Sequence, residues 1–345
     1  MAVLDGMTVL DLTQQLPGPY ATSLLGSLGA RVIKIEPPTG DPSRHLDPEM
    51  FARVNAGKES VVVDLKSQVG RAALQRLIAQ SDVLVEGFRP GVMERLGADW
   101  PVCQRANPLL VYCSISGFGS VGPYAQVPVH DMNLMAWGDP EGARRSSGRI
   151  GVPWVDLGTG TTAAVLIVSA WHTARRLGHG TQLDVSMQDV ALSWSRVKPL
   201  RPGVEPTYGV YETKDHKEIV IAILEDHFWE RLCRAFQLVD LGGDETLAGY
   251  ESRVQSADKI HSAIGRRVSE LSLADVLALA TSHDLPITAV DPADDELAVE
   301  QLAATGFANN RFRLPTSASD PEIVSVPQCG EHTERVLTEF GCGTE

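Results

Sequence analysis

The sequence has few cysteines and no long hydrophobic run. Its five cysteines form no CxxC pair and no zinc-ligand spacing, and their odd number and scatter are typical of a reducing compartment. We therefore expect a cytoplasmic protein. No stretch approaches the roughly 20 apolar residues of a membrane span. No basic segment precedes an apolar run after Met1, so we expect neither a membrane anchor nor a signal peptide.

Positive charge is scarce as well. The 30 Lys and Arg residues face 44 Asp and Glu residues, which gives a formal net charge of −14. Proteins that bind nucleic acids or anionic membranes usually carry the opposite sign, so we expect neither partner. No cluster of His, Asp and Glu has metal-ligand spacing, and no GxSxG motif is present, so we expect no metal site and no hydrolase-type serine.

The chain does contain enough apolar material for two domains. Hydrophobic residues make up 43 % of its 345 residues, and a domain commonly takes roughly 100–200 residues. Short apolar strands alternate with amphipathic helical segments in the first half. This alternation predicts an open, Rossmann-like α/β sheet. The expected strands are 7–12, 31–36, 60–65, 82–88, 109–116 and 182–187.

A change in composition divides the chain. Three prolines and a glycine lie within 197–206, and they break helices and central strands, so we expect a linker there. The large α/β domain then covers 1–196. A small α+β domain covers 207–304 and opens with a β-hairpin that turns at 214–217. We expect a second linker at 305–325 and a C-terminal segment, 326–345, that returns to the large domain.

A polar, glycine-rich segment at 129–160 separates two apolar regions, and its turn-forming residues predict a loop. His130 and Asp156 lie near its two ends, and a long helix is expected at 157–177. Ionisable groups on loops beside a rigid scaffold are common in functional sites. From the residues alone, a helix N-cap explains Asp156 as well as a functional role does. An ordinary loop histidine is the better explanation of His130.

Two short motifs resemble nucleotide-binding signatures only superficially. GFGSVG at 117–122 follows a predicted strand, but Pro123 and further loop sequence follow it, where a dinucleotide fingerprint requires a helix. We interpret it as a turn at the carboxyl end of a strand, where ligands of open α/β sheets bind. NAGKES at 55–60 lacks Walker A spacing. Lys58 is either presented to a phosphate or is a surface lysine.

Seven segments spread along the chain share a resemblance to one known family. They are LDGMTVLDLTQQLPGPYA, LGARVIKIEPPTGD, VNAGKESVVVDLK, DVLVEGFRPGVMERLGAD, NPLLVYCSISGFGSVGP, GHGTQLDVSMQD and CGEHTERVLTEFG. These runs resemble the family III CoA-transferases and α-methylacyl-CoA racemases, also called CaiB/BaiF proteins. The resemblance implies a large CoA-binding domain and a small domain in each protomer, and a homodimer of two interlocked protomers. It also implies an acyl-CoA substrate, with no cofactor beyond the coenzyme A that the substrate carries.

The resemblance also implies catalytic residues. Asp156 in VDLGTG occupies the place of the family's shared aspartate, which attacks the thioester in the transferase branch. His130 in VHDMN matches the histidine of a GHDxNY-like motif in the racemase branch. Glu225 in IAILEDHFW matches the glutamate of a GAxEPQFW-like run. The sequence departs from these patterns at Leu134, Val155 and Asp226, where the family has tyrosine, glycine and proline.

Racemisation requires a base on each face of the α-carbon. An imidazole such as that of His130 exchanges protons near neutral pH, whereas Asp156 needs burial to raise its pKa. Glu225 would orient the imidazole. Backbone N–H groups at the start of the 157–177 helix would stabilise the enolate. For the CoA moiety itself, Lys34, Lys58, Gly87 and Arg89 are the expected contacts.

Our leading hypothesis from sequence is therefore an isomerase, an acyl-CoA racemase or epimerase that acts on 2-methylacyl-CoA esters through an enolate. One alternative is a family III CoA-transferase that forms an aspartyl-CoA thioester on Asp156, with His130 incidental. Another is a protein that binds CoA esters without turnover. The chain is short for a family III transferase, which favours the racemase branch. Nothing in the sequence names the acyl group.

Overall fold

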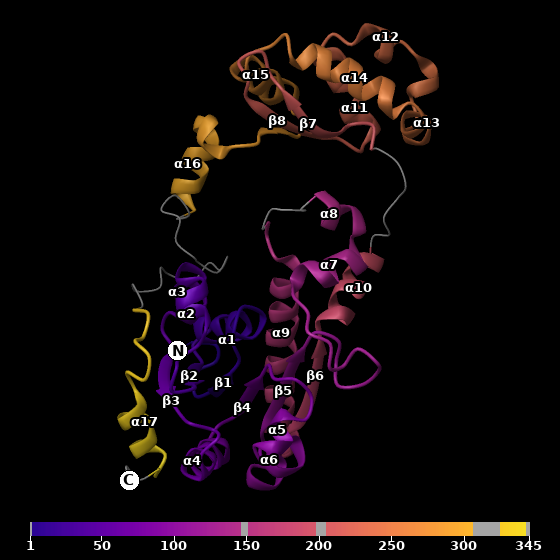
Figure 1. Ribbon diagram of the computed structural model, residues 1–345. Coiled ribbons are helices and arrows are strands. Elements are labelled where there is room, and N and C mark those ends of the chain that lie inside the picture. Colours follow the sequence, from indigo (N-terminus) through magenta and orange to yellow (C-terminus); the bar gives the residue numbers. More distant parts are fainter. Residues whose placement is uncertain (1, 146–150, 198–204, 306–324, 343–345) are drawn as a thin grey trace. The chain divides into compact units, whose positions relative to one another are not determined.

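The computed structural model describes residues 2–145, 151–197, 205–305 and 325–342. The chain forms two compact units (Figure 1). Unit 1 comprises residues 1–200 with 314–345, and unit 2 comprises residues 201–313. Most of the two predicted linkers, 197–206 and 305–325, lies outside the described residues. Among the described residues, none of the helices has the length and apolar character needed to cross a membrane.

Unit 1 is built on a six-stranded parallel sheet with the order β3-β2-β1-β4-β5-β6. The order reverses between β1 and β4, because β2 and β3 lie on one side of β1 and the later strands on the other. The predicted open α/β fold is confirmed. The strands are β1 (Thr8–Leu12), β2 (Arg31–Glu36), β3 (Glu59–Val62), β4 (Val83–Glu86), β5 (Val111–Ser116) and β6 (Thr181–Ser186).

Helices cover both faces of this sheet. Val9, Val85 and Cys113 point toward α1 and α9, whereas Leu10, Leu84 and Tyr112 point toward α4 and α6. This alternation explains the nearly continuous apolar character of the strands. The helices are α1 (Pro17–Ser27), α2 (Ser43–Leu46), α3 (Pro48–Asn55), α4 (Gln68–Ala79), α5 (Val92–Arg95), α6 (Trp100–Ala106), α7 (Asp131–Gly138), α8 (Pro140–Arg145), α9 (Trp154–Leu177), α10 (Met187–Val197) and α17 (Thr333–Glu339).

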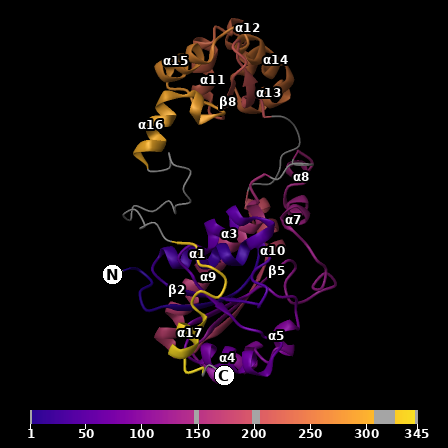
Figure 2. The ribbon, with the colours of Figure 1, turned by 60° about the vertical axis from the view of Figure 1, so that its left-hand side comes forward.

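The C-terminal segment covers the edge of the sheet. The His332 N–H donates to the Ser60 carbonyl at 2.9 Å, and the Val62 N–H donates to Thr333 Oγ1 at 2.9 Å. Figure 1 shows α17 beside β3, and Figure 2 shows the same helix from a second direction. Residues about 270 positions apart therefore close an edge that would otherwise present unpaired backbone groups.

Unit 2 is a small α+β unit with an antiparallel sheet of order β7-β8-β9. The hairpin turns at the predicted place, where Thr213 N–H donates to the Lys217 carbonyl at 2.8 Å. Its own core lies between the sheet and α11, α14 and α15. Its elements are β7 (Tyr208–Glu212), β8 (Glu218–Ala222), β9 (Ile287–Ala289), α11 (Asp226–Ala235), α12 (Val239–Gly242), η1 (Glu245–Leu247), α13 (Tyr250–Gln255), α14 (Ala257–Val268), α15 (Leu273–His283), η2 (Pro292–Asp294) and α16 (Glu296–Ala304).

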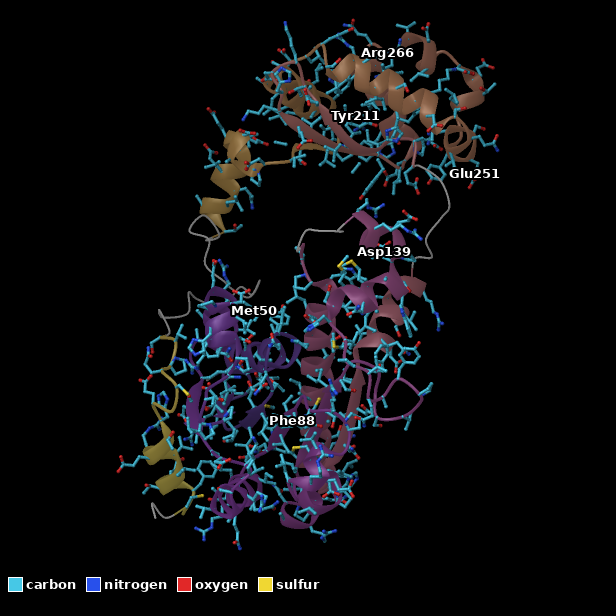
Figure 3. The ribbon with its side chains drawn as sticks, in the orientation of Figure 1. Met50, Phe88, Asp139, Tyr211, Glu251 and Arg266 are labelled. Atoms are coloured by element: carbon cyan, nitrogen blue, oxygen red, sulfur yellow. The ribbon has the colours of Figure 1, made fainter. Side chains whose placement is uncertain are left out.

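The central segment differs from the predicted loop, because it contains two helices, α7 and α8. Leu134, Met135 and Ala143 are buried in one cluster with residues of α9 and α10. This burial stabilises helical turns that the glycine, proline and aspartate content disfavours. Asp139 lies between the two helices (Figure 3), and its side chain accepts the Gly142 N–H at 2.8 Å. The long helix α9 begins at Trp154 rather than at the predicted residue 157.

Candidate functional site

A cavity of about 350 Å³ lies at the carboxyl ends of β1, β4 and β5. Thr13, Gly87 and Gly117, which directly follow these strands, contribute to its walls, and Asp156 lines it from the start of α9. The cavity therefore lies at the point where the strand order reverses. Open α/β sheets bind their ligands at such a switch point, so this cavity is the candidate functional site of unit 1.

Asp156 is the residue in this cavity whose chemistry is most perturbed. It is the third residue of α9, so it is not the helix N-cap. Among the described residues, its carboxylate has no hydrogen-bond partner. Burial, followed by the negative charge of nearby Asp131, raises its pKa to about 7. A carboxylate that is half protonated near neutral pH and open to a cavity can act as a nucleophile or a base.

The first N–H groups of α9 are all occupied. Asp131 Oδ1 accepts the Val155 N–H at 2.8 Å and the Asp156 N–H at 3.0 Å. The N–H groups of Trp154 and Leu157 donate to backbone carbonyls. The prediction that N–H groups at this helix start stabilise a substrate oxyanion is therefore wrong, because the side chain of Asp131 and the local backbone already take them.

His130 lines the same cavity as Asp156. It is exposed and directly precedes α7, and its N–H donates to Asn133 Oδ1 at 3.0 Å. The structure thus brings the two predicted residues of the central segment to one cavity, although they are 26 positions apart in the sequence. Asp131 explains this arrangement, because it is the residue after His130 and its side chain is hydrogen-bonded to the start of α9.

Gly87 and Arg89 also line the cavity. They follow β4, where the buried Glu86 carboxylate accepts the Phe88 N–H at 2.8 Å and so fixes the turn. Phe88 is labelled in Figure 3. Arg89 is exposed and forms no ion pair within the described part of the chain. It also lines an adjoining cavity of about 300 Å³. Its guanidinium is therefore free to pair with an anion, and its role as a CoA contact stays a prediction.

Lys58 has a different role from the predicted one. It is buried, and its Nζ donates to oxygens of four residues at 2.8–2.9 Å: Asp11, Pro19, Thr22 and Asn55. Burial lowers its pKa to about 8 against the opposing effect of Asp11. No N–H group of Lys58 remains for a phosphate, so the prediction that Lys58 contacts CoA is wrong.

Lys34 is buried in the same network. Its Nζ lies 2.8 Å from Asp41 Oδ2 and donates to the Thr13 carbonyl at 2.9 Å. Lys34 is not accessible to a ligand, so the prediction that it contacts CoA is wrong as well. Burial favours a protonated Asp11, but the charges of Lys58 and Lys34 outweigh this effect and lower its pKa. The network holds the β1–α1 turn, and that turn forms one wall of the cavity.

Glu225 lies in unit 2, where it directly precedes α11. Its side chain is exposed, and among the described residues it makes no hydrogen bond or ion pair. Its predicted catalytic role stays a prediction.

Some residues of the site were not predicted from the sequence. Gln14 and Gln15 line the cavity, and Gln15 has a positive φ of 64°. The sequence feature that could have identified Gln14 and Gln15 is that two polar residues closely follow a buried strand. The contact from Asp131 to α9 was not predicted either. The sequence feature that points to it is Pro153, which directly precedes the helix and has no side chain that can accept the first N–H groups. An acceptor from another part of the chain is then needed.

The fold and the site define a class of protein, an α/β protein with a carboxylate of raised pKa in a cavity at the switch point of its sheet. The sequence profile of CoA-transferase family III matches residues 4–333. The chain therefore belongs to CoA-transferase family III, and the resemblance inferred from sequence is confirmed. Among the described residues, no group of three or more His, Cys, Asp and Glu side chains is placed to hold a metal ion.

Relatives and solved structures support this assignment. The chain is 35 % identical over 312 residues to acetyl-CoA:oxalate CoA-transferase of Acetobacter aceti, covering 82 % of this chain and 79 % of that protein. It is 28 % identical to succinate–glutarate CoA-transferase of Agrobacterium fabrum, covering 98 % and 95 %. A CaiB/BaiF family protein from Brucella suis superposes with a TM-score of 0.81 at 27 % identity, covering 98 % and 99 %.

Proposed function

We propose that the protein is a CoA-transferase that moves coenzyme A between carboxylic acids, with Asp156 as the nucleophile. The observation that carries this proposal is the Asp156 carboxylate, unpaired among the described residues and open to the cavity with a raised pKa. The two curated relatives described above are named CoA-transferases, which favours this reaction over the racemase that we expected from the sequence.

The proposed reaction has two halves. An Asp156 oxygen attacks the thioester carbon of the donor acyl-CoA, the CoA thiolate leaves, and a mixed anhydride remains. The thiolate then attacks the carboxyl carbon of Asp156, which releases the donor acid and leaves an aspartyl-CoA thioester. The acceptor carboxylate reverses these steps and departs as its CoA ester. The raised basicity of Asp156 makes the ionised form a better nucleophile.

Binding of the CoA moiety is proposed for the residues after β4. Arg89 is an exposed arginine with no ion pair in the described residues, and it can hold a CoA phosphate. The backbone at Gly87 lines the path toward Asp156. The reaction needs no cofactor beyond coenzyme A itself. The names of the relatives include oxalate, succinate and glutarate, so short dicarboxylic acids are the first acceptors to try.

The test of this function is a transfer assay combined with trapping. The protein is incubated with acetyl-CoA or succinyl-CoA and with oxalate, succinate or glutarate, and new CoA esters are separated by chromatography. We expect transfer, and we expect mass spectrometry to find CoA attached to the peptide that contains Asp156. Asp156→Asn should abolish both signals, whereas Asp139→Asn should keep them. Turnover by Asp156→Asn would contradict the proposal.

Racemisation remains a second candidate because His130 lines the same cavity as Asp156. In D₂O, a racemase exchanges the α-proton of a 2-methylacyl-CoA without any acceptor acid, and His130→Ala should abolish that exchange from at least one face. A transferase tolerates His130→Ala and shows no exchange. A protein that only binds CoA esters shows neither reaction but gains thermal stability with acyl-CoA.

We further propose that the protein acts as a homodimer in the cytoplasm. The dimer is proposed from the family resemblance. The compartment is proposed from the cysteines, because all five are free thiols. Light scattering on the purified protein measures the molar mass directly, and a monomeric mass would contradict the dimer.

A further inference from the structure

The N-terminus of α9 is capped from another helix. Pro153 precedes the helix and offers no side-chain acceptor for its first N–H groups. Asp131, at the start of α7, instead accepts the N–H groups of Val155 and Asp156 at 2.8 and 3.0 Å. Unpaired N–H groups at a helix start are stabilised by an acceptor, and a carboxylate also interacts favourably with the helix dipole. Asp131 thus joins the starts of α7 and α9.

The same carboxylate is an electrostatic neighbour of the Asp156 side chain. Burial raises the pKa of Asp131, and its two N–H bonds oppose that effect. Asp156 has no such bonds among the described residues, so of the two carboxyls it is the one that takes up a proton first. Besides Asp156, the ionisable side chains that line the cavity are those of His130 and Arg89.

We propose that Asp131 is the positioning residue of the nucleophile, because it fixes the backbone of Asp156 and holds a second negative charge against its side chain. This inference rests on the proposed function, in which Asp156 attacks a thioester. The fixed backbone aims the carboxylate at the cavity. The neighbouring charge makes that carboxylate more basic, and hence more nucleophilic once it is ionised.

Three variants separate the two effects of Asp131. Asp131→Asn keeps a carbonyl oxygen that can accept the two N–H groups but removes the charge. Asp131→Ala removes both. The matched control is Asp139→Asn, which removes a carboxylate from the same stretch of chain. Asp139 accepts the Gly142 N–H and is not among the charges that act on Asp156.

The first measurement titrates Asp156 without any turnover. Carbon NMR of the full-length protein with ¹³C-labelled aspartate carboxyls identifies the Asp156 signal by its loss in Asp156→Asn. We expect a midpoint near pH 7 in the unchanged protein and in Asp139→Asn. In Asp131→Asn the midpoint should fall by roughly half a pH unit or more. An unchanged midpoint in Asp131→Asn would overturn the proposal.

The second measurement follows the rate of aspartyl-CoA formation in a single turnover from pH 5 to pH 9. In Asp131→Asn, the inflection should move to lower pH and the plateau rate should fall by about threefold or more. Asp131→Ala should lose more rate and also melt at a lower temperature. If Asp131→Asn melts at a lower temperature and leaves the inflection in place, Asp131 is only a structural cap and the proposal is wrong.

The two measurements also separate this inference from the proposed function. If the unchanged protein forms no aspartyl-CoA with any donor, the transferase function fails. The NMR titration still decides whether the charge of Asp131 acts on Asp156. If the Asp156 midpoint then falls in Asp131→Asn, the electrostatic effect of Asp131 on Asp156 is supported, and only the proposed transfer reaction is rejected.

Discussion

Ionisable side chains near the carboxyl ends of the strands fall into two kinds. Lys58 and Lys34 are buried, Lys58 with four oxygen partners and Lys34 paired with Asp41 and the Thr13 carbonyl. Buried polar groups are normally satisfied, because an unsatisfied one costs about 1–3 kcal/mol, so the two lysines serve the fold. Asp156 is half-buried, lines the cavity and has no hydrogen-bond partner among the described residues. Its carboxylate therefore remains available to a ligand.

Asp156 should destabilise the protein at the pH where it reacts. Its pKa of about 7 in the folded protein lies above the ordinary value of 3.8. Folding is therefore favoured by the bound proton at low pH, and this contribution is lost as the pH rises through 7. At pH 8, Asp156→Asn should raise the free energy of unfolding by on the order of 1–3 kcal/mol.

Thermal denaturation at two pH values checks this expectation. Asp156→Asn should melt a few degrees above the unchanged protein at pH 8, and the difference should shrink toward pH 4, where both side chains are neutral. Asp139→Asn is the control and should show no such dependence. A variant that is less stable at pH 8 would mean that Asp156 has a stabilising partner.

Sequence reasoning identified the residues of the central segment but not the role of the lysines. His130 and Asp156 were predicted from local motifs, and both line one cavity. The burial of Lys58 depends on Asp11, 47 positions away, and that of Lys34 on the turn after β1. Partners so distant in sequence leave no local pattern. A lysine in a glycine-containing turn therefore looks like a ligand contact or a surface residue.

At the scale of elements, the close contact between α1 and α9 sets the position of Asp156. A Cβ atom on Gly160 would lie 2.6 Å from the Pro17 carbonyl oxygen, which real structures do not allow. The register of α9 against α1 therefore depends on the missing side chain at residue 160, one helical turn after Asp156.

At this contact, a glycine-to-alanine substitution should change the stability of the protein in the direction opposite to the one that helix propensity predicts. Alanine usually stabilises a helix by up to about 1 kcal/mol relative to glycine. Gly160→Ala should instead lower the free energy of unfolding by about 1–3 kcal/mol, because the methyl group overpacks the contact. Gly26→Ala in α1 is the control, since its Cβ would meet Val32 at an ordinary 3.5 Å. Urea titration compares the two, and equal stabilities would contradict the close contact.

The elements themselves were predicted to different degrees. The six parallel strands follow from their apolar runs, because strands buried on both faces have a strong local signal. The helices α7 and α8 were missed, since Leu134 and Ala143 stabilise them only by packing against α9 and α10. The start of α9 was placed three residues late, because its cap comes from Asp131 rather than from the residue before the helix.

At the scale of the whole molecule, the proposed homodimer requires an apolar contact surface. The helix α9 offers one, because Val165 is 61 % exposed and the adjacent Leu166 is 40 % exposed in the single chain. Exposed apolar groups on a central helix are typical of surfaces that a partner covers. We therefore expect this part of α9 to be buried in the dimer.

A charge at this position tests the dimer. Val165→Lys should lower the molar mass measured by light scattering to that of a monomer, because a charge is costly to bury in an apolar interface. Val69→Lys is the matched control, since Val69 is 67 % exposed on α4. A Val165→Lys protein that keeps the dimer mass would exclude this surface from the interface.

The cover that residues 332 and 333 give to β3 affects the order in which the chain can fold during its synthesis. The ribosome completes the strands of unit 1 early, but β3 keeps an open edge until residues 332 and 333 emerge. The core of unit 2 lies within residues 211–287 and is finished sooner. During synthesis, unit 1 therefore has an unpaired strand edge until its C-terminal segment is made. An unpaired edge of this kind can pair with a wrong strand.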